Sequence, residues 1–299
     1  MQGEASVRAW VDYFRDLGIH DFYRRGEAAP GDASEEAGES VVSLDAAAEP
    51  AMSAPTVPSV AAAQCVGYSR EKFIAEQQVG APVAVTHFAK LISFNDLAPL
   101  PARTVPGAER AAALRAIQEE IGDCTRCPLA YAGRKNIVFG DGSPSARLMF
   151  VGEGPGADED AQGIPFVGKA GQLLNNMIAA MGLARSDVYI ANIVKCRPPS
   201  NRVPEPIEAN TCSQFLLRQI DVVQPEVIVA LGATAAMYLL GVKQTLASLR
   251  GRWHSCRGAK LLVTYHPAFL LRDSRQKTEA WKDLQMAMGE LGLKPPARK

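Results

Sequence analysis

Four of the six cysteines are spaced so that they could hold one metal centre. Cys124 and Cys127 form a C-x-x-C pair, and Cys196 and Cys212 stand alone farther along the chain. These ligands can converge only if the fold brings distant segments together around one centre that prefers sulfur. Structural zinc sites usually use two close pairs, whereas the second pair here is split, so the spacing favours an iron–sulfur cluster. Zinc, or four buried thiols without a metal, are the alternatives.

A glycine-rich run, Gly152-Glu153-Gly154-Pro155-Gly156, follows an apolar segment. It is not the dinucleotide fingerprint G-x-G-x-x-G, because Pro155 and the acidic residues after it interrupt the approach to a helix. Its glycines instead allow close backbone approach to a flat ligand. A tight turn without a ligand is the alternative interpretation. Phe166, which lies between a proline and a glycine shortly before a predicted helix, is placed to stack on a base.

The elements that must position these residues alternate along the chain. Four apolar runs are typical of buried parallel strands: 147–151, 188–193, 227–231 and 261–264. Helical patterns fall at 108–121, 169–181, 205–223, 234–240 and 278–291. The alternation predicts an α/β fold, with an open parallel sheet covered by helices on both faces. Ligands of such sheets bind at the carboxyl ends of the strands, where Gly152, Asn192 and His266 fall.

The charge and composition divide the chain in two. Residues 1–107 carry 8 Lys and Arg against 14 Asp and Glu, and residues 108–299 carry 24 against 18. A basic second part suits a polyanionic partner such as nucleic acid, although an ordinary solvated surface is the alternative. No signal peptide or apolar run of membrane-spanning length is visible, and the cysteines do not form a secreted disulfide pattern. We therefore expect a soluble, cytoplasmic protein that does not enter a membrane.

The predicted domains follow the same division. Residues 1–107 are expected to be a partly disordered N-terminal extension, with a short amphipathic helix at 6–25 and an Ala-, Pro- and Glu-rich linker after it. The helix could dock on a protein partner or fold back on the main domain. Residues 108–299 are expected to form the compact domain.

Four motifs of the second part resemble the family 4 uracil-DNA glycosylases, which are the iron–sulfur members of their superfamily. They are Gly152–Gly156, Pro165–Gln172, Asn192–Pro199 and His266–Ala268, in the order that the family has. The resemblance runs from about residue 117 to about residue 291. It implies a three-layer α/β/α sandwich with a central four-stranded parallel sheet. It also implies a structural [4Fe–4S] cluster on Cys124, Cys127, Cys196 and Cys212.

The resemblance further implies a reaction and a set of binding residues. The enzymes flip uracil out of DNA into a pocket and hydrolyse the bond between the base and deoxyribose, which leaves an abasic site for base excision repair. Phe166 would stack on uracil, and Asn192 would hydrogen-bond to its N3–H and O4. Backbone groups of residues 152–154 would hold O2, and His266 would donate a hydrogen bond to the same oxygen as charge develops there.

The carboxylate that assists the reaction is less clearly indicated. Better-known uracil glycosylases have an aspartate and a tyrosine where this chain has Gly154 and Gly156. A carboxylate must then come from Glu153, Glu159 or Asp160. We expect Glu153 to position water or stabilise the sugar cation, and Glu159 to help close the pocket against the thymine methyl group. The alternative is that these are acidic residues that interact with a helix dipole.

The run after His266 resembles the loop that such enzymes insert into the minor groove. Leu270 or Leu271 would fill the gap that the flipped base leaves, and Arg272 would contact phosphate. The alternative is a helix that begins here and buries its leucines. Lys169 and Lys195 flank the pocket motifs, so no lysine is expected to line the pocket and the enzyme is expected to be monofunctional.

We therefore expect a monomeric uracil-DNA glycosylase whose partner is uracil-containing DNA, single- or double-stranded. One rival within the superfamily links covalently to abasic DNA through a histidine in an inserted Arg- and Lys-rich loop. That insertion should follow Lys195, where Cys196-Arg197-Pro198-Pro199 stands instead. A second rival is a DNA-binding iron–sulfur protein without turnover, against which Phe166, Asn192 and His266 argue.

Overall fold

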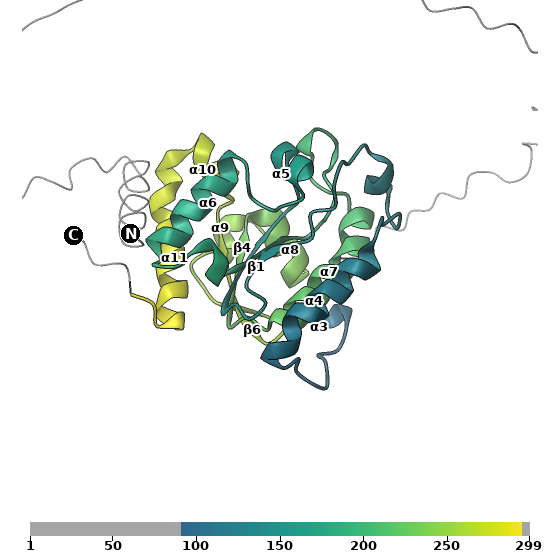
Figure 1. The fold of residues 1–299 in the computed structure, drawn as a ribbon. Helices are drawn as coiled ribbons and strands as arrows, with labels where there is room; N and C mark the ends of the chain where they lie inside the picture. The colour runs from purple at the N-terminus through teal and green to yellow at the C-terminus, as the bar shows by residue number, and fades with distance from the viewer. Residues whose placement is uncertain (1–90, 295–299) are drawn as a thin grey trace, which may run out of the picture. The chain divides into compact units, whose positions relative to one another are not determined.

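A computed structural model of the protein describes residues 91–294, and Figure 1 shows their fold. Its centre is a six-stranded sheet in the order β1-β3-β2-β4-β6-β5. The four inner strands are parallel to one another: β3 (Tyr189–Asn192), β2 (Leu148–Gly152), β4 (Val227–Leu231) and β6 (Ala259–Thr264). Two short strands pair antiparallel at the edges: β1 (Asp141–Gly142) and β5 (His254–Cys256).

The sheet corrects the predicted fold in one respect. It is mixed and six-stranded, whereas the sequence predicted a four-stranded parallel sheet. The two additional strands have two and three residues, and β5 includes the polar residues His254 and Ser255. Neither has the apolar run from which the inner strands were predicted, since an edge strand is not buried on both faces.

Helices cover both faces of the sheet. On one face lie α4 (Gly107–Ile121), α7 (Pro206–Val223) and α8 (Ala233–Leu240), and on the other lie α6 (Lys169–Ala180), α10 (Pro267–Arg272) and α11 (Lys277–Leu291) (Figure 1). Successive residues of β2 alternate between the two cores: Met149 and Val151 belong to the first, and Leu148 and Phe150 to the second. Because both faces are covered, every residue of β2 and β4 is buried.

The helices and inner strands predicted after residue 107 are all present, and their ends differ from the prediction by at most two residues. The α/β class is therefore confirmed. Three short helices were not predicted, α3 (Phe94–Leu97), α5 (Ala157–Gln162) and α9 (Leu246–Leu249), and α10 was only the alternative to a loop after His266. Helices of one or two turns present too few residues for a periodic apolar pattern.

The segment just before α4 packs against the sheet domain. Phe94 in α3 is buried, and α3 contacts α8. Arg257 donates hydrogen bonds to the carbonyl groups of Phe94, Ala98 and Pro99. These residues fall within the predicted N-terminal extension, whose boundary at residue 107 stays a prediction. The predicted helix at 6–25, the linker after it and the partner docking on that helix lie outside the described residues.

None of the helices in residues 91–294 combines the length and the apolar character that crossing a membrane requires.

Candidate active site

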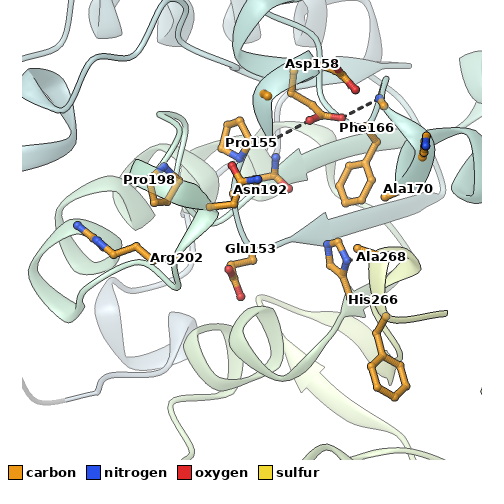
Figure 2. Close-up of a pocket in the computed structure, with 18 of the residues that line it drawn as sticks. Glu153, Pro155, Asp158, Phe166, Ala170, Asn192, Pro198, Arg202, His266 and Ala268 are labelled. Atoms are coloured by element: carbon orange, nitrogen blue, oxygen red, sulfur yellow. Dashed lines mark hydrogen bonds between the residues drawn. The ribbon is translucent and has the colours of Figure 1, made fainter. Parts of the chain in front are cut away.

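A pocket of about 590 Å³ opens at one end of the parallel strands. Gly152 and Asn192 end the neighbouring strands β2 and β3 and are paired in register, and His266 follows β6. Figure 2 shows the side chains of Asn192, Phe166 and His266 around the same part of this pocket. Three separate strand ends therefore bring predicted binding residues together at one edge of the sheet.

Asn192 presents an unpaired oxygen. The residue is 2% exposed, and its side-chain Oδ1 is buried without a hydrogen-bond partner. No other buried side-chain nitrogen or oxygen in residues 91–294 is in this state. Since an unpaired buried acceptor is costly, the amide is suited to a ligand that donates a hydrogen bond to it.

Gly152 leaves the space in which Asn192 and Phe166 approach each other. A β-carbon at this position would lie 2.4 Å from Oδ1 of Asn192 and 2.6 Å from the ring of Phe166. Gly154 is similarly confined, because a β-carbon there would lie 2.8 Å from Val194. The strand end therefore requires glycine for a steric reason, not for an unusual backbone angle.

His266 is held as a neutral ring beside Phe166. The ring centroids lie 5.6 Å apart, and the planes are tilted by 34°. Nδ1 accepts a hydrogen bond of 3.1 Å from the backbone N–H of Ala268, which fixes the proton of the neutral ring on Nε2. Burial, assisted by the charge of Arg272, lowers the pKa of His266 to about 4. At neutral pH the imidazole can therefore donate a hydrogen bond from Nε2 without being charged.

The three candidate carboxylates have different surroundings. Glu153 lines the pocket, and its carboxylate has no hydrogen-bond partner among the described residues. Glu159 also lines the pocket, but it accepts backbone N–H groups of Gly156 at 3.0 Å and of Val167 and Gly168 at 2.9 Å each. Of the two, only Glu153 has both carboxylate oxygens without a hydrogen-bond partner among the described residues.

Asp160, the third candidate, does not line the pocket. It is 2% exposed and accepts hydrogen bonds from the backbone N–H groups of Lys135 and Asn136. Its role is therefore to attach α5 to the loop that follows the first cysteine pair.

The four predicted metal ligands line a second, much smaller cavity. Cys124 and Cys127 follow α4, Cys196 follows β3, and Cys212 lies in α7. Cys256 lies in β5, does not line this cavity and is buried. The fold therefore brings together the four cysteines that the spacing selected.

The surroundings of these cysteines suit thiolate ligands of an iron–sulfur cluster. Three of the four sulfurs accept N–H groups: Cys124 from Arg126 at 3.6 Å, Cys196 from Arg134 at 3.5 Å, and Cys212 from the backbone of Lys195 at 3.3 Å. Hydrogen bonds to the sulfurs are one means by which proteins tune such clusters.

The cysteine thiols must lose their protons before they can bind a metal centre. Burial raises the pKa of Cys196 to about 11 and that of Cys212 to about 12, so ligation must displace their protons. Within residues 91–294, no three His, Cys, Asp or Glu side chains form a group that could hold a metal ion. The ligands of a cluster bind different iron atoms and stand farther apart than those of a single ion. Four cysteine sulfurs around one cavity are the donor set that a [4Fe–4S] cluster takes, so the residues present fit such a cluster.

Comparison with known proteins identifies the family of this chain. Residues 139–285 match the model of the uracil DNA glycosylase superfamily. The chain is 48% identical over 161 residues to a type-4 uracil-DNA glycosylase of Thermotoga maritima, which covers 52% of this chain and 82% of that protein. The chain belongs to the type-4 uracil-DNA glycosylases.

Two further relatives are uracil-DNA glycosylases of type 4 and of type 5. A type-4 uracil-DNA glycosylase of Pyrobaculum aerophilum is 44% identical over 184 residues, which is 59% of this chain and 93% of that protein. A type-5 uracil-DNA glycosylase of the same organism is 32% identical over 181 residues, or 49% of this chain and 78% of that protein. The similarity to the type-4 relatives is thus the stronger one.

The three predicted DNA-contact residues of this type-4 uracil-DNA glycosylase lie in different places. Leu270 is completely buried in the core between the sheet and α6 and α11, so it is not presented to a ligand. Leu271 is 47% exposed, and Arg272 lines the pocket. The α10 helix begins at Pro267, and its turn directs two successive leucines to opposite environments.

Sequence reasoning missed several residues of the pocket. Lys169 lines it, although the sequence predicted that this lysine flanks it, because α6 begins there directly beside the pocket. Asp158 and Arg202 also line the pocket. Lys195 does not line it. The signal for Lys169 was its place at the first position of a predicted helix that follows the Phe166 segment.

Proposed function

We propose that this protein is a monofunctional uracil-DNA glycosylase that flips uracil out of DNA and hydrolyses its N-glycosidic bond. The product is an abasic site, the substrate of the next step of base excision repair. The observation that carries the proposal is the buried, unpaired Oδ1 of Asn192 in a pocket that also contains Phe166 and a neutral His266. An aromatic face and a fixed amide are the groups that a flipped base requires.

Recognition begins with Phe166 and Asn192. The Phe166 ring stacks on the face of uracil, while Oδ1 of Asn192 accepts the N3–H and its amide N–H donates to O4. Cytosine presents an acceptor at N3 and an amino donor on C4. The Oδ1 acceptor of Asn192 would then face an acceptor, and its amide N–H would face a donor. A buried polar pair without partners costs about 1–3 kcal/mol for each group, which disfavours cytosine strongly.

His266 stabilises the departing base. As the bond to deoxyribose breaks, negative charge develops on uracil O2, and Nε2–H of the neutral imidazole donates to it. Removing one donor of this kind usually costs about a hundredfold to a thousandfold in rate. The bond between Nδ1 and the Ala268 N–H supports this role because it leaves the proton on Nε2.

Glu153 acts on the sugar side of the reaction. Its carboxylate is free of other hydrogen bonds among the described residues, so it can orient a water molecule or stabilise the positive charge that develops on the sugar. Glu159 is assigned a positioning role here, since its carboxylate already accepts three backbone N–H groups. These bonds fix the wall of the pocket on the side where thymine would carry its methyl group.

Cys124, Cys127, Cys196 and Cys212 would hold a [4Fe–4S] cluster in a structural role. When bound, the cluster supplies no chemistry to the hydrolysis and serves to join the segments that carry its ligands. One of those ligands lies four residues after Asn192, so the cluster restrains the segment that recognises the base.

Leu271 and Arg272 are the proposed contacts to DNA. Leu271 is exposed beside the pocket and would occupy the space left by the flipped nucleotide. Arg272 would bind a neighbouring phosphate. We propose that the protein acts as a monomer, since each chain carries a complete pocket.

Hydrolysis without a covalent intermediate is proposed because the buried lysine is not available. The amino group of Lys195 donates to Asn192 O at 3.0 Å and to Gln219 Oε1 at 2.6 Å, away from the pocket. Lys169 lies at the pocket but is exposed to solvent, and a lysine that acts as a nucleophile is usually desolvated. Borohydride reduction during the reaction should therefore trap no protein–DNA adduct.

The function is tested with a duplex oligonucleotide that contains one uracil, incubated with the protein and then heated in alkali. Strand scission at the uracil is expected, and Asn192→Ala and His266→Ala should each abolish it. Asn176→Ala and His254→Ala are matched controls, since both residues lie outside the pocket. An intact strand after treatment with the wild-type protein would contradict the proposal and favour a DNA-binding protein without turnover.

A further inference from the structure

Phe166 has an unusual backbone conformation for an aromatic residue. Its φ angle is 52°, in the left-handed region that bulky side chains rarely adopt. Such a conformation persists only where neighbouring groups hold it, and it is common at binding sites. The orientation of the Phe166 ring therefore depends on what restrains the main chain of residues 165–168.

Helix α6 packs closely against this segment. A β-carbon at Gly171, in the first turn of α6, would lie only 1.9 Å from the carbonyl oxygen of Phe166. The close approach leaves that carbonyl buried against the helix, so it needs a hydrogen-bond donor from elsewhere.

Arg185 supplies that donor. Its guanidinium group donates to the carbonyl oxygen of Pro165 at 2.6 Å and to that of Phe166 at 3.1 Å. The same group donates to Oδ1 of Asn175 in α6 at 3.0 Å and forms an ion pair with Asp141 in β1 at 3.0 Å. The planar guanidinium thus links four groups in a fixed arrangement, which an ammonium group cannot do.

Glu159 holds the opposite side of the same segment. Arg185 binds the carbonyl groups of residues 165 and 166, while Glu159 binds the N–H groups of Val167 and Gly168. Arg185 does not line the pocket, so it cannot touch a bound base. Its side chain is 25% exposed.

We propose that Arg185 is a positioning residue for base recognition: it fixes Phe166 in the orientation that stacks on uracil. This inference rests on the proposed function, in which Phe166 stacks on the base. It adds that stacking on the base depends on Arg185, a residue that lies outside the pocket and follows α6.

A double-mutant cycle tests this dependence. Arg185→Ala should lower the single-turnover rate of uracil release by about tenfold or more, and should weaken the binding of free uracil as an inhibitor. In a Phe166→Ala background, Arg185→Ala should cause little further loss, because the side chain that it positions is absent. Equal losses in both backgrounds would overturn the proposal, as would no loss in either.

Two other variants separate positioning from general stability. Asp141→Asn removes the ion pair and leaves both carbonyl bonds, so it should change the rate by less than about threefold. Arg185→Lys keeps the positive charge but lacks the planar guanidinium that binds both carbonyl groups, so its rate should resemble that of Arg185→Ala. Added methylguanidinium should partly restore the rate of the Arg185→Ala variant. Arg147→Ala removes another arginine–carboxylate pair, that with Glu226, and is the matched control for the loss of an ion pair.

Hydrogen exchange distinguishes failure of this inference from failure of the proposed function. In the protein without DNA, Arg185→Ala should speed exchange of the Val167 and Gly168 amides relative to amides of β4, whether or not uracil is the substrate. Unchanged exchange would overturn the positioning role. A wild-type protein that releases no uracil would instead contradict the proposed function.

Discussion

The amino group of Lys195 lies 3.0 Å from the main-chain oxygen of Asn192. The backbone N–H of the same lysine donates to the sulfur of Cys212 at 3.3 Å. One buried residue thus connects the end of β3, which carries the proposed base-recognition residue, to one of the proposed cluster ligands. Gln219 in α7 accepts a second hydrogen bond from the lysine at 2.6 Å and so fixes the position of its amino group.

Lys195→Met should destabilise the protein and slow uracil release. The substitution leaves the oxygens of Asn192 and Gln219 without their donor, at a cost of about 1–3 kcal/mol for each buried group. Urea unfolding and single-turnover kinetics measure the two effects. Adding Gln219→Leu should recover no stability, because the Phe139 carbonyl oxygen and the Tyr189 hydroxyl then lose the amide donor of Gln219. A Lys195→Met protein as stable as the wild type would contradict this account.

Gly152→Ala should abolish activity without preventing folding. The new β-carbon would overlap the Oδ1 of Asn192 and the Phe166 ring, which have to move out of the positions that a base requires. Gly289→Ala is the matched control, since nothing lies within 4 Å of a β-carbon there and alanine favours the α11 helix by about 0.5–1 kcal/mol. The release of uracil and the thermal midpoint should be measured for both. Normal activity of Gly152→Ala would show that the two side chains are not confined.

The neutral state of His266 should make stability depend on pH. Its pKa is about 4 in the folded protein and about 6.5 when unfolded, so the unfolded state binds more protons between these values. Stability from this residue is present above pH 6.5 and is lost as the pH falls toward 4, by up to about 3 kcal/mol. His266→Gln should lack this part of the pH dependence. The assignment would be contradicted if the free energy of unfolding had the same pH dependence in both proteins between pH 4 and 7.

The two adjacent leucines of α10 should behave differently when each is replaced by alanine. Leu271→Ala should slow uracil release from duplex DNA and affect single-stranded DNA less, because only the duplex leaves a gap to fill. Leu270→Ala should instead reduce the free energy of unfolding by about 2–5 kcal/mol, as buried leucines do. Rates on both substrates and urea unfolding measure the contrast. A larger kinetic defect in Leu270→Ala than in Leu271→Ala, at equal stability, would reverse the assignment.

Cys212→Ser should remove the visible absorption of the cluster and lower the thermal midpoint. Cys256→Ser is the matched control, because this buried cysteine lies outside the cavity of the four ligands. Iron and sulfide content, measured on the purified proteins, should fall only in the first variant. Stoichiometric zinc without iron in the wild-type protein would contradict a cluster.

Much of the fold could be predicted from the sequence because the inner strands are buried on both faces. Residues 227–231 form an unbroken apolar run, and β4 occupies the same residues. The edge strands could not be predicted in this way. Their pairing depends on the neighbours β3 and β6, and not on an apolar pattern of their own.

The candidate site could be predicted in its composition but not in its contacts. The spacing of the cysteines indicated a metal centre, the predicted strand ends placed Asn192 and His266 at one edge of the sheet, and the family resemblance implied their roles. The different surroundings of Glu153 and Glu159, and of Leu270 and Leu271, could not be derived from sequence. Each distinction depends on which backbone groups and core positions the folded chain places next to a side chain.

The order of the cysteine ligands along the chain has a consequence for biosynthesis. Two ligands precede the first strand, the third follows β3, and the last lies in α7. The ribosome therefore delivers the segment that carries Asn192 before the final ligand emerges. If the proposed cluster joins these segments, the pocket would be completed only after α7 has emerged and only where iron and sulfide are supplied.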